Sequence, residues 1–410
     1  MDLEVRKINF HYGGKKILDD INFEAGKELI GVIGPNGSGK TTLLRNIDGV
    51  LKPDKGSIFI DGEDVTTCSP KNLAKKMGIV PQDSQIKFEF TALDVVLMGR
   101  NPYLNRFQLE GETEIEIAKR YMELTHCWHL AERPITELSG GEARKVIIAR
   151  ALTQEPKILL LDEPTSHLDL NHQVEIMDLI KDLSRDKVII AALHDLNLAA
   201  RYCDRLILLN NGKVIVQGNT EKILTRKNIK EVFGVDVMIR RETATDSYAL
   251  TPVKRGEEKN VWVHVISGGG SGGELMVKLI TMGFRVSAGV LNVFDTDYQT
   301  AKDLGVEVVG EAPFSEIGEN AHEANLKMAE KADVVILADF PVGLGNLKNV
   351  DAAEYSASKG ILTIVIDLTP VQQKDFTGKL EERWRVLNEK GAIFVQSSQE
   401  AIKKVDTSMT

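Results

Sequence analysis

The stretch that decides the fold reads GPNGSGKT over residues 34–41. An apolar run, 28–33, precedes it and Thr42-Leu43-Leu44 follows, so a glycine-rich turn lies between a predicted strand and a predicted helix. Glycines let the backbone adopt positive φ and aim several N–H groups at one anion. Lys40 can then reach the β- and γ-phosphates, and Thr41 can offer a hydroxyl to Mg²⁺. The stretch therefore predicts a site for a nucleoside triphosphate.

Two carboxylates follow another apolar run further along the chain. Residues 158–161 predict a buried strand that leads directly into Asp162 and Glu163. Asp162 is expected to hold Mg²⁺ through water. Glu163, one residue beyond, points to the other side of the strand and is expected to polarise the attacking water. Together with the phosphate loop, these acids predict Mg²⁺-dependent phosphoryl transfer.

A second anion site is predicted at Leu138-Ser139-Gly140-Gly141-Glu142, where two glycines stand between a hydroxyl residue and a glutamate that opens a helix. One γ-phosphate does not need two such sites from one subunit. With this LSGGE sequence, the first 240 residues or so resemble the ATP-binding cassette family. The resemblance implies that Ser139 and its glycines contact ATP bound to a partner subunit in a head-to-tail homodimer.

Further motifs of that family occur in order. Tyr12 is at the position of an aromatic residue that stacks on adenine, Gln82 at that of the glutamine loop, and His194 at that of the switch histidine. Residues 166–169 match the D-loop. The resemblance implies catalytic roles for Lys40, Glu163 and His194, and metal contacts from Thr41, Gln82 and Asp162. It also implies nucleotide contacts from Tyr12, Gly34, Pro35, Asn36, Gly37, Ser38, Gly39, Lys40, Thr41, Thr42, Ser139, Gly140 and Gly141.

The process that ATP hydrolysis drives is indicated by a further segment, residues 90–104, which read FTALDVVLMGRNPYL. This segment is similar to the one that follows the glutamine loop in importers of iron siderophores, haem and cobalamin, where it docks the membrane permease. Alternatively, it is an amphipathic helix packed within the helical subdomain. The resemblance implies an ATP-hydrolysing importer subunit that is peripheral on the cytoplasmic face of the membrane, with an integral permease and an external substrate-binding protein as partners. The alternative is a soluble regulatory ATPase that works without a permease.

The composition of the chain limits the classes of protein to which it can belong. The chain has 410 residues, 42% of them hydrophobic, which favours two soluble domains. No run approaches the length of a membrane span, and the start of the chain does not read as a signal peptide. Residues 1–254 carry 35 basic and 37 acidic side chains, and residues 255–410 carry 16 and 23, so neither half predicts nucleic-acid binding. Three widely spaced cysteines indicate reduced thiols.

The positions where the sequence changes from α/β periodicity to polar residues and back predict the limits of the domains. We expect an α/β ATP-binding domain over 1–254, with a mixed sheet and a helical subdomain at about 85–150, a polar linker at 255–260, and a Rossmann-like α/β domain over 261–410. Strands of this last domain are predicted at 261–266, 285–291, 306–309, 334–338, 361–366 and 392–395.

The second domain has its own glycine loop, SGGGSGG, over residues 267–273. Gly268, Gly270 and Gly273 satisfy the dinucleotide pattern, and Asp295 and Asp297 stand near the ribose-binding distance. The loop predicts either a small-molecule or nucleotide site or a structural and dimerising role. Asp339 and Asp367 follow later strands and could share one crevice with it. The whole domain could act as a sensor of the imported nutrient or as a handle that stabilises the dimer.

Overall fold

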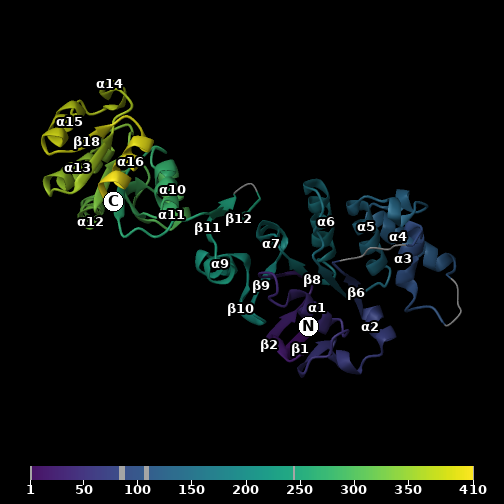
Figure 1. The fold of residues 1–410 in the computed structure, drawn as a ribbon. Helices are drawn as coiled ribbons and strands as arrows, with labels where there is room; N and C mark the ends of the chain where they lie inside the picture. The colour runs from purple at the N-terminus through teal and green to yellow at the C-terminus, as the bar shows by residue number, and fades with distance from the viewer. Residues whose placement is uncertain (1, 83–87, 106–109, 243–244, 410) are drawn as a thin grey trace. The chain divides into compact units, whose positions relative to one another are not determined.

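The computed structural model describes residues 2–82, 88–105, 110–242 and 245–409 (Figure 1). They form two compact units. The first comprises the chain up to Gly234 together with Arg241–Leu250, and the second comprises Val235–Arg240 and the chain from Thr251 onward. Residues 255–260, expected to be a linker, belong to the second unit, where the Lys259 backbone N–H donates to the Gly283 carbonyl at 2.8 Å. The expected start of the helical subdomain, at about residue 85, lies outside the described residues.

Two sheets build the first unit. An antiparallel sheet has the order β2-β1-β4-β5, and a mixed sheet has the order β10-β9-β3-β8-β7-β6, parallel except for the β9–β10 pair. Their strands are β1 (Leu3–Tyr12), β2 (Lys15–Ala25), β3 (Leu29–Ile33), β4 (Lys55–Ile60), β5 (Glu63–Asp64), β6 (Met77–Val80), β7 (Ile158–Asp162), β8 (Val188–Leu193), β9 (Arg205–Asn210) and β10 (Lys213–Gly218). The residues of β3, β7 and β8 are all buried, as their continuous apolar runs predict.

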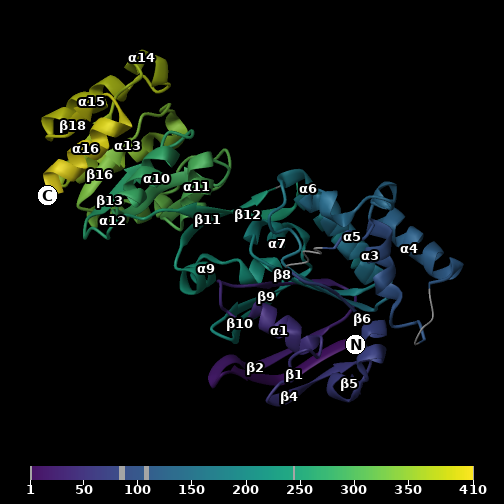
Figure 2. The same ribbon diagram turned by 45° about the vertical axis from the view of Figure 1, so that its right-hand side comes forward.

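Helices cover both sheets of this unit. They are α1 (Lys40–Ile47), α2 (Pro70–Lys76), α3 (Ala92–Leu97), α4 (Glu112–Leu124), α5 (Gly140–Leu152), α6 (Leu170–Leu183), α7 (Leu196–Tyr202), α8 (Thr220–Ile223) and α9 (Arg226–Phe233). Figure 2 shows α1 between the two sheets, where Leu43, Leu44 and Ile47 join the core cluster that also contains strand residues of both. Helices α3, α4 and α5 pack on one another and form the predicted helical layer.

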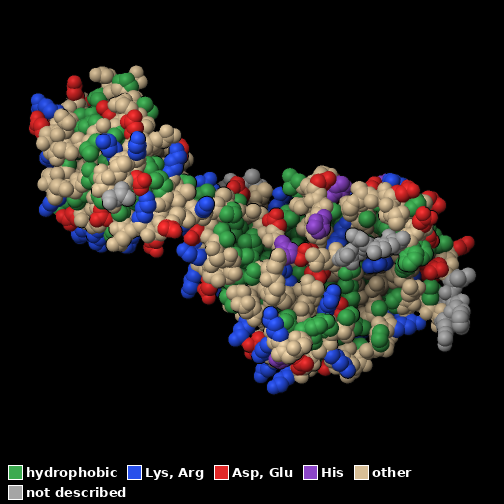
Figure 3. Space-filling model, viewed as in Figure 1, with side chains coloured by type: hydrophobic (Ala, Val, Ile, Leu, Met, Phe, Trp, Pro, Cys, Tyr) green, Lys and Arg blue, Asp and Glu red, His purple; other side chains and the backbone are tan. Residues whose placement is uncertain are grey.

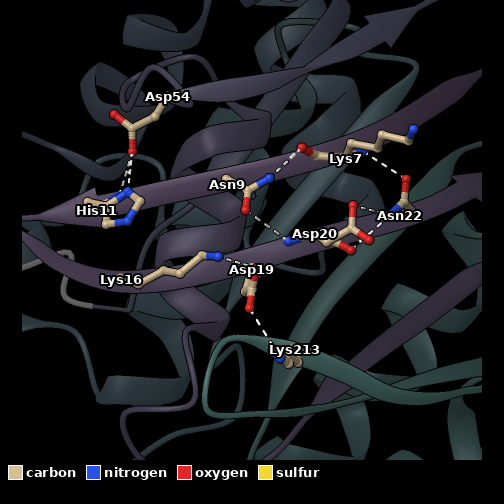
Figure 4. Close-up of polar contacts among 9 residues, drawn as sticks. All are labelled: Lys7, Asn9, His11, Lys16, Asp19, Asp20, Asn22, Asp54 and Lys213. Atoms are coloured by element: carbon tan, nitrogen blue, oxygen red, sulfur yellow. Dashed lines mark hydrogen bonds and ion pairs between the residues drawn. The ribbon is translucent and has the colours of Figure 1, made fainter.

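The β1–β2 pair has an irregular register, and polar side chains bond to the backbone there (Figure 4). Lys7 and Asp20 have positive φ angles of 49° and 54°, and the ladder between the strands shifts there. The Asn22 side-chain oxygen accepts the Lys7 N–H at 2.8 Å, and the Asn9 side-chain oxygen accepts the Asp20 N–H at 3.3 Å. Side-chain amides thus replace the missing ladder bonds at this bulge.

A hairpin-like pair, β11 (Asp236–Glu242) and β12 (Ser247–Val253), precedes the main sheet of the second unit. That sheet is entirely parallel, in the order β15-β14-β13-β16-β17-β18. Its strands are β13 (Trp262–Ile266), β14 (Arg285–Asn292), β15 (Glu307–Glu311), β16 (Val334–Leu337), β17 (Leu362–Ile366) and β18 (Ile393–Val395). Their helices are α10 (Gly273–Thr281), α11 (Thr296–Leu304), α12 (Glu319–Glu330), α13 (Leu347–Ser358), α14 (Val371–Lys374), α15 (Leu380–Glu389) and α16 (Ser398–Met409).

In chain order, this sheet reads 3-2-1-4-5-6, which is the Rossmann order. Each predicted strand of this unit is present within a residue or two of its expected limits. Apolar residues on the two faces of the sheet form two separate cores, one beneath α10, α11 and α16 and one beneath α13 and α15. The predicted fold class, a P-loop ATPase domain followed by a Rossmann-like α/β domain, is confirmed.

On the face drawn in Figure 3, basic and acidic groups alternate across both units. Among the described residues, no helix is long and apolar enough to cross a membrane.

Candidate functional site

The phosphate loop connects β3 to α1, as predicted. Gly34 approaches the neighbouring strand so closely that a Cβ atom there would lie 2.1 Å from the Leu209 carbonyl oxygen. Gly39, directly before α1, has a φ of 107°, which an L side chain rarely adopts. The Lys40 ammonium is buried and donates to the carbonyl oxygens of Gly34 at 2.8 Å and Pro35 at 3.2 Å. The backbone of the phosphate loop therefore folds back onto the Lys40 ammonium and hydrogen-bonds to it.

Burial lowers the pKa of Lys40, and the charges of Glu163 and Asp162 oppose that effect. A polyphosphate in the loop would add negative charge next to this ammonium and favour its charged form. The site is thus electrostatically suited to an anion.

The acidic end of β7 lies next to the start of α1. Asp162 is 9% exposed, and the Thr41 hydroxyl donates to its Oδ1 at 3.2 Å. Burial is the main cause that raises the pKa of Asp162. Two hard oxygen ligands, a hydroxyl and a carboxylate, are therefore side by side beneath the loop, which is the donor set that Mg²⁺ prefers.

Glu163 is the centre of a polar cluster. Its Oε2 accepts the side-chain N–H of Gln82 at 2.8 Å, and its Oε1 contacts Nε2 of His194. The backbone of Glu163 has a φ of 49°. Two hydrogen bonds hold it there: the Glu163 N–H donates to the Ala192 carbonyl, and the Ser166 hydroxyl donates to the Glu163 carbonyl. Non-glycine residues with positive φ cluster at functional sites because the surrounding structure must hold them there.

Sheet order brings these residues together. Strand β8 lies between β3 and β7, so His194, which follows β8, stands between the phosphate loop and Glu163. A cleft of about 720 Å³ opens at this edge of the sheet. The cleft is lined by Lys15, Ile17, Asn36, Gly37, Gly39, Lys40, Thr41, Thr42, Gln82, Glu163, Ser166, His167 and His194. Most of the predicted phosphate, metal and catalytic residues thus surround one space.

Tyr12 ends β1 and does not line this cleft. Its ring is 61% exposed and packs edge-on to Phe10, with 5.9 Å between ring centroids. The preceding residue, His11, is fixed by Asp54, whose Oδ2 accepts the His11 backbone N–H at 2.7 Å and contacts Nδ1 at 2.9 Å (Figure 4). The strand partner of Tyr12, Lys15, does line the cleft. Tyr12 is therefore near the opening, with its ring in solvent.

The Ser139–Gly141 motif opens α5 away from the cleft lining. The Ser139 hydroxyl accepts the Glu142 N–H at 3.3 Å, and the Glu142 carboxylate accepts the Ser139 N–H at 2.8 Å, which forms a capping box. A Cβ atom on Gly141 would lie 2.2 Å from Cδ2 of His172 in α6. Gly141 is thus required for packing, whether or not it also meets a nucleotide. The structure does not bring this motif to the chain's own phosphate loop.

Sequence reasoning missed Arg144, which lies in α5 and is buried. Its guanidinium donates to four carbonyl oxygens: those of Pro81 at 2.8 Å, Asp162 at 3.0 Å, Glu163 at 2.8 Å and Pro164 at 3.0 Å. Burial lowers its pKa to about 10. The sequence carries no distinct signal for this role, because Arg144 stands among charged neighbours, with Glu142 two positions before it and Lys145 directly after it. Arg144 thus joins Pro81, next to Gln82 in the glutamine loop, to the segment that carries Glu163.

In the second unit, carboxylates of the chain itself accept three N–H groups of the glycine loop. The Asp297 carboxylate, 1% exposed, accepts the N–H groups of Gly272 at 2.9 Å and Gly273 at 2.8 Å. Asp295 accepts the Gly269 N–H at 2.8 Å. The two acids expected near a ribose instead cap the loop itself. Gly268 lines a cavity at this edge, whereas Gly270 and Gly273 do not.

These features define the class of the chain as a P-loop nucleotide-binding protein with a helical subdomain and an added Rossmann-like unit. Residues 18–166 match the ABC transporter family, and residues 286–402 match the MJ0874 family. The cobalamin import ATP-binding protein of Halobacterium salinarum is 37% identical over 368 residues, which are 88% of this chain and 89% of the relative. The chain therefore belongs to the ABC transporter family of ATP-binding proteins, and it is an ATP hydrolase, as the sequence resemblance predicted.

Other relatives match a smaller share of the chain. The petrobactin import ATP-binding protein of Bacillus anthracis is 36% identical over 254 residues, 61% of this chain and 92% of the relative. A solved chain described as a metal-chelate type ABC transporter in an inward-facing conformation is 30% identical, with a TM-score of 0.55, and covers 61% of this chain and 97% of its own length. Both are thus matched over almost all of their own length.

Proposed function

We propose that this chain powers an importer of metal chelates, such as an iron siderophore, haem or cobalamin, as a head-to-tail homodimer bound to a membrane permease. The observation that carries the proposal is the split site. Lys40, Thr41, Glu163 and His194 line one cleft, whereas Ser139–Gly141, the predicted second anion site, lies outside its lining. A second copy would supply the missing half.

The residues of the cleft suit hydrolysis of ATP. The loop N–H groups and Lys40 would hold the β- and γ-phosphates. Thr41 and Asp162 would hold Mg²⁺, which when bound neutralises phosphate charge. Glu163 would orient the attacking water and accept its proton, and His194 would donate to the γ-phosphate. In the chain alone, Gln82 and His194 both contact the Glu163 carboxylate, so both contacts must rearrange when a nucleotide and water enter.

The names of the relatives support import of metal chelates as the work done. Docking of the permease is supported by an apolar groove of about 640 Å³ in the first unit. Met98 and Gly99, from the segment 90–104 predicted to dock the permease, line it together with Val50, Leu51 and Leu73. We propose that a cytoplasmic segment of the permease occupies this groove, and that an external binding protein delivers the cargo.

The catalytic part is tested with Glu163→Gln. We expect ATP binding to persist while turnover falls by about 100-fold or more, since the general base is lost, and we expect a dimer to accumulate with ATP. Lys40→Ala is the matched comparison, because it should weaken nucleotide binding itself. Normal hydrolysis by the glutamine variant would exclude Glu163 as the base.

The permease part is tested by co-purification from membranes. Val50 is 71% exposed and lines the groove, so Val50→Glu should abolish recovery of a polytopic membrane partner without affecting the fold. Ile115→Glu is the control, because Ile115 is 41% exposed on α4 outside the groove. If the wild-type chain recovers no membrane partner, the soluble regulatory ATPase is the better description. Equal recovery by both variants would place the docking surface elsewhere.

A further inference from the structure

A cavity of about 410 Å³ lies in the second unit, at the carboxyl edge of its parallel sheet. Strand β13 has β14 on one side and β16 on the other, so the chain order reverses at β13 and leaves a crevice between the loops that follow. The cavity is lined by Ser267, Gly268, Gly269, Val290, Leu291, Asn292, Asp295, Glu311, Ser315, Ile317, Pro341, Gly343, Gly345, Asn346 and Asn349. Its position is that of a ligand site in open α/β folds.

Three of the loop N–H groups that could attract a phosphate in such a fold are already bonded to carboxylates. Asp297 accepts those of Gly272 and Gly273, and Asp295 accepts that of Gly269. A Cβ atom on Gly272 would lie 2.2 Å from the Ser267 hydroxyl, so this turn is also closely packed. An incoming anion would have to displace a carboxylate and would be repelled by it. The loop geometry therefore excludes a dinucleotide on these N–H groups.

The charge of the lining favours a cation. Asp295 and Glu311 both face the cavity, and none of the described residues that line it is basic. The Glu311 carboxylate accepts the N–H groups of Gly318 at 2.9 Å and Ala312 at 3.0 Å, which hold its pKa below the usual value. Each oxygen accepts one of these bonds and keeps a further lone pair. The nearby Lys348 ammonium is paired with Glu319 at 2.7 Å.

Exposed apolar side chains stand on the loops that contribute to the cavity lining. Phe294, Phe314 and Leu344 are 74%, 99% and 67% exposed. Each belongs to a loop whose neighbouring residues line the cavity: Asn292 and Asp295 flank the first, Ser315 follows the second, and Gly343 and Gly345 flank the third. Three large apolar side chains in solvent at one edge indicate a binding surface. A bare metal ion would not use them.

The floor of the cavity is rigid. Asn349 is 2% exposed, and its side-chain N–H donates to the Val290 carbonyl at 2.9 Å. Asn346 donates to the Pro341 carbonyl at 2.9 Å and accepts the Gly343 N–H at 2.8 Å. These amides fix the loop after β16 and join α13 to β14, while the backbone N–H groups on Asp295 and Glu311 hold the two carboxylates in place before any ligand enters.

We propose that this cavity binds a small organic amine, with its ammonium on Asp295 and Glu311 and its apolar body against Phe294, Phe314 and Leu344. The ligand is thus cationic and partly apolar, rather than the dinucleotide that the glycine pattern suggests. The site lies within one unit and does not depend on the ATPase proposal.

Calorimetric titration of the full chain without nucleotide tests the proposal. Phenethylamine is the probe, phenylpropionate replaces its ammonium by a carboxylate, and ethylamine lacks the ring. We expect phenethylamine to bind at least about 10-fold more tightly than phenylpropionate, because one lost ionic contact of this kind is worth about a factor of ten. It should also bind at least about 10-fold more tightly than ethylamine, which has no ring to bury against the apolar side chains. Glu311→Gln should reduce its affinity by a similar factor, whereas the exposed neighbour Glu316→Gln should not.

A second variant separates binding from folding. Phe314→Ser changes only a fully exposed side chain and should bring phenethylamine closer to ethylamine in affinity. The proposal is wrong if phenethylamine gives no saturable heat, if phenylpropionate binds as tightly, or if the Glu311 and Glu316 variants behave alike. Since no nucleotide is present, none of these outcomes bears on ATP hydrolysis.

Discussion

Acid should destabilise the second unit through His264, which lies in the centre of its sheet and has no exposed surface. Its Nδ1 contacts the Ser287 hydroxyl at 2.8 Å, and its Nε2 contacts the Asn325 side-chain oxygen at 2.9 Å. The Trp262 indole N–H donates to Ser287 at 3.0 Å, and Asn325 donates to Asn349 at 3.4 Å. An amide oxygen only accepts, so Nε2 carries the proton and Nδ1 accepts from the serine. A second proton on the ring would sit on Nδ1, which could then no longer accept the hydrogen bond from the Ser287 hydroxyl.

Burial lowers the pKa of His264 from 6.5 to about 4, although the Asn325 contact opposes the shift. The unfolded chain therefore takes up a proton as pH falls below 6.5, while the folded unit resists until about pH 4. The free energy of unfolding should fall by about 1.4 kcal/mol per pH unit across this window, or about 3 kcal/mol in all. Above pH 6.5, this histidine should contribute no pH dependence.

Urea unfolding followed by tryptophan fluorescence measures this effect. In a Trp128→Phe background, the remaining tryptophans, Trp262 and Trp384, both belong to the second unit and report its unfolding alone. His264→Gln should be less stable at neutral pH but should lack the extra loss between pH 6.5 and 4. Parallel stability curves for the two proteins across that window would refute the reasoning.

Two substitutions test the packing around the ATP site. Gly141→Ala should cost about 1–3 kcal/mol of stability, because its Cβ would lie 2.2 Å from the His172 ring, and adding His172→Ala should restore it. If turnover stays low in that double variant, Gly141 also contacts nucleotide; full recovery of turnover would leave it a packing role only. Arg144→Lys should lower the unfolding free energy by about 3 kcal/mol and reduce turnover more than ATP affinity, because lysine cannot serve four carbonyl groups that hold Glu163 in place. Unchanged turnover would show that Arg144 does not position the base.

Much of the ATP site could be read from the sequence because its parts are local. The phosphate loop needs fixed spacing between a strand and a helix, so Gly34 to Thr41 are recognisable without a fold. The same holds for Asp162 and Glu163 at a strand end, and for the alternation of strands and helices after Val261. Arg144 could not be assigned, because its role lies in four carbonyl groups from segments distant in sequence.

The sequence by itself thus determined the two α/β units, the P-loop chemistry and the order of the motifs, since spacing and periodicity act within short stretches. Only the tertiary structure decided which motifs meet. Sheet order put His194 between Lys40 and Glu163, and it left Ser139–Gly141 outside the cleft. In the second unit, the pairing of β13 with β14 brought Asp295 and Asp297 onto the glycine loop. A pattern that predicts an anion site was thereby filled by the chain's own carboxylates, because strand pairing joins loops that the sequence keeps more than twenty residues apart.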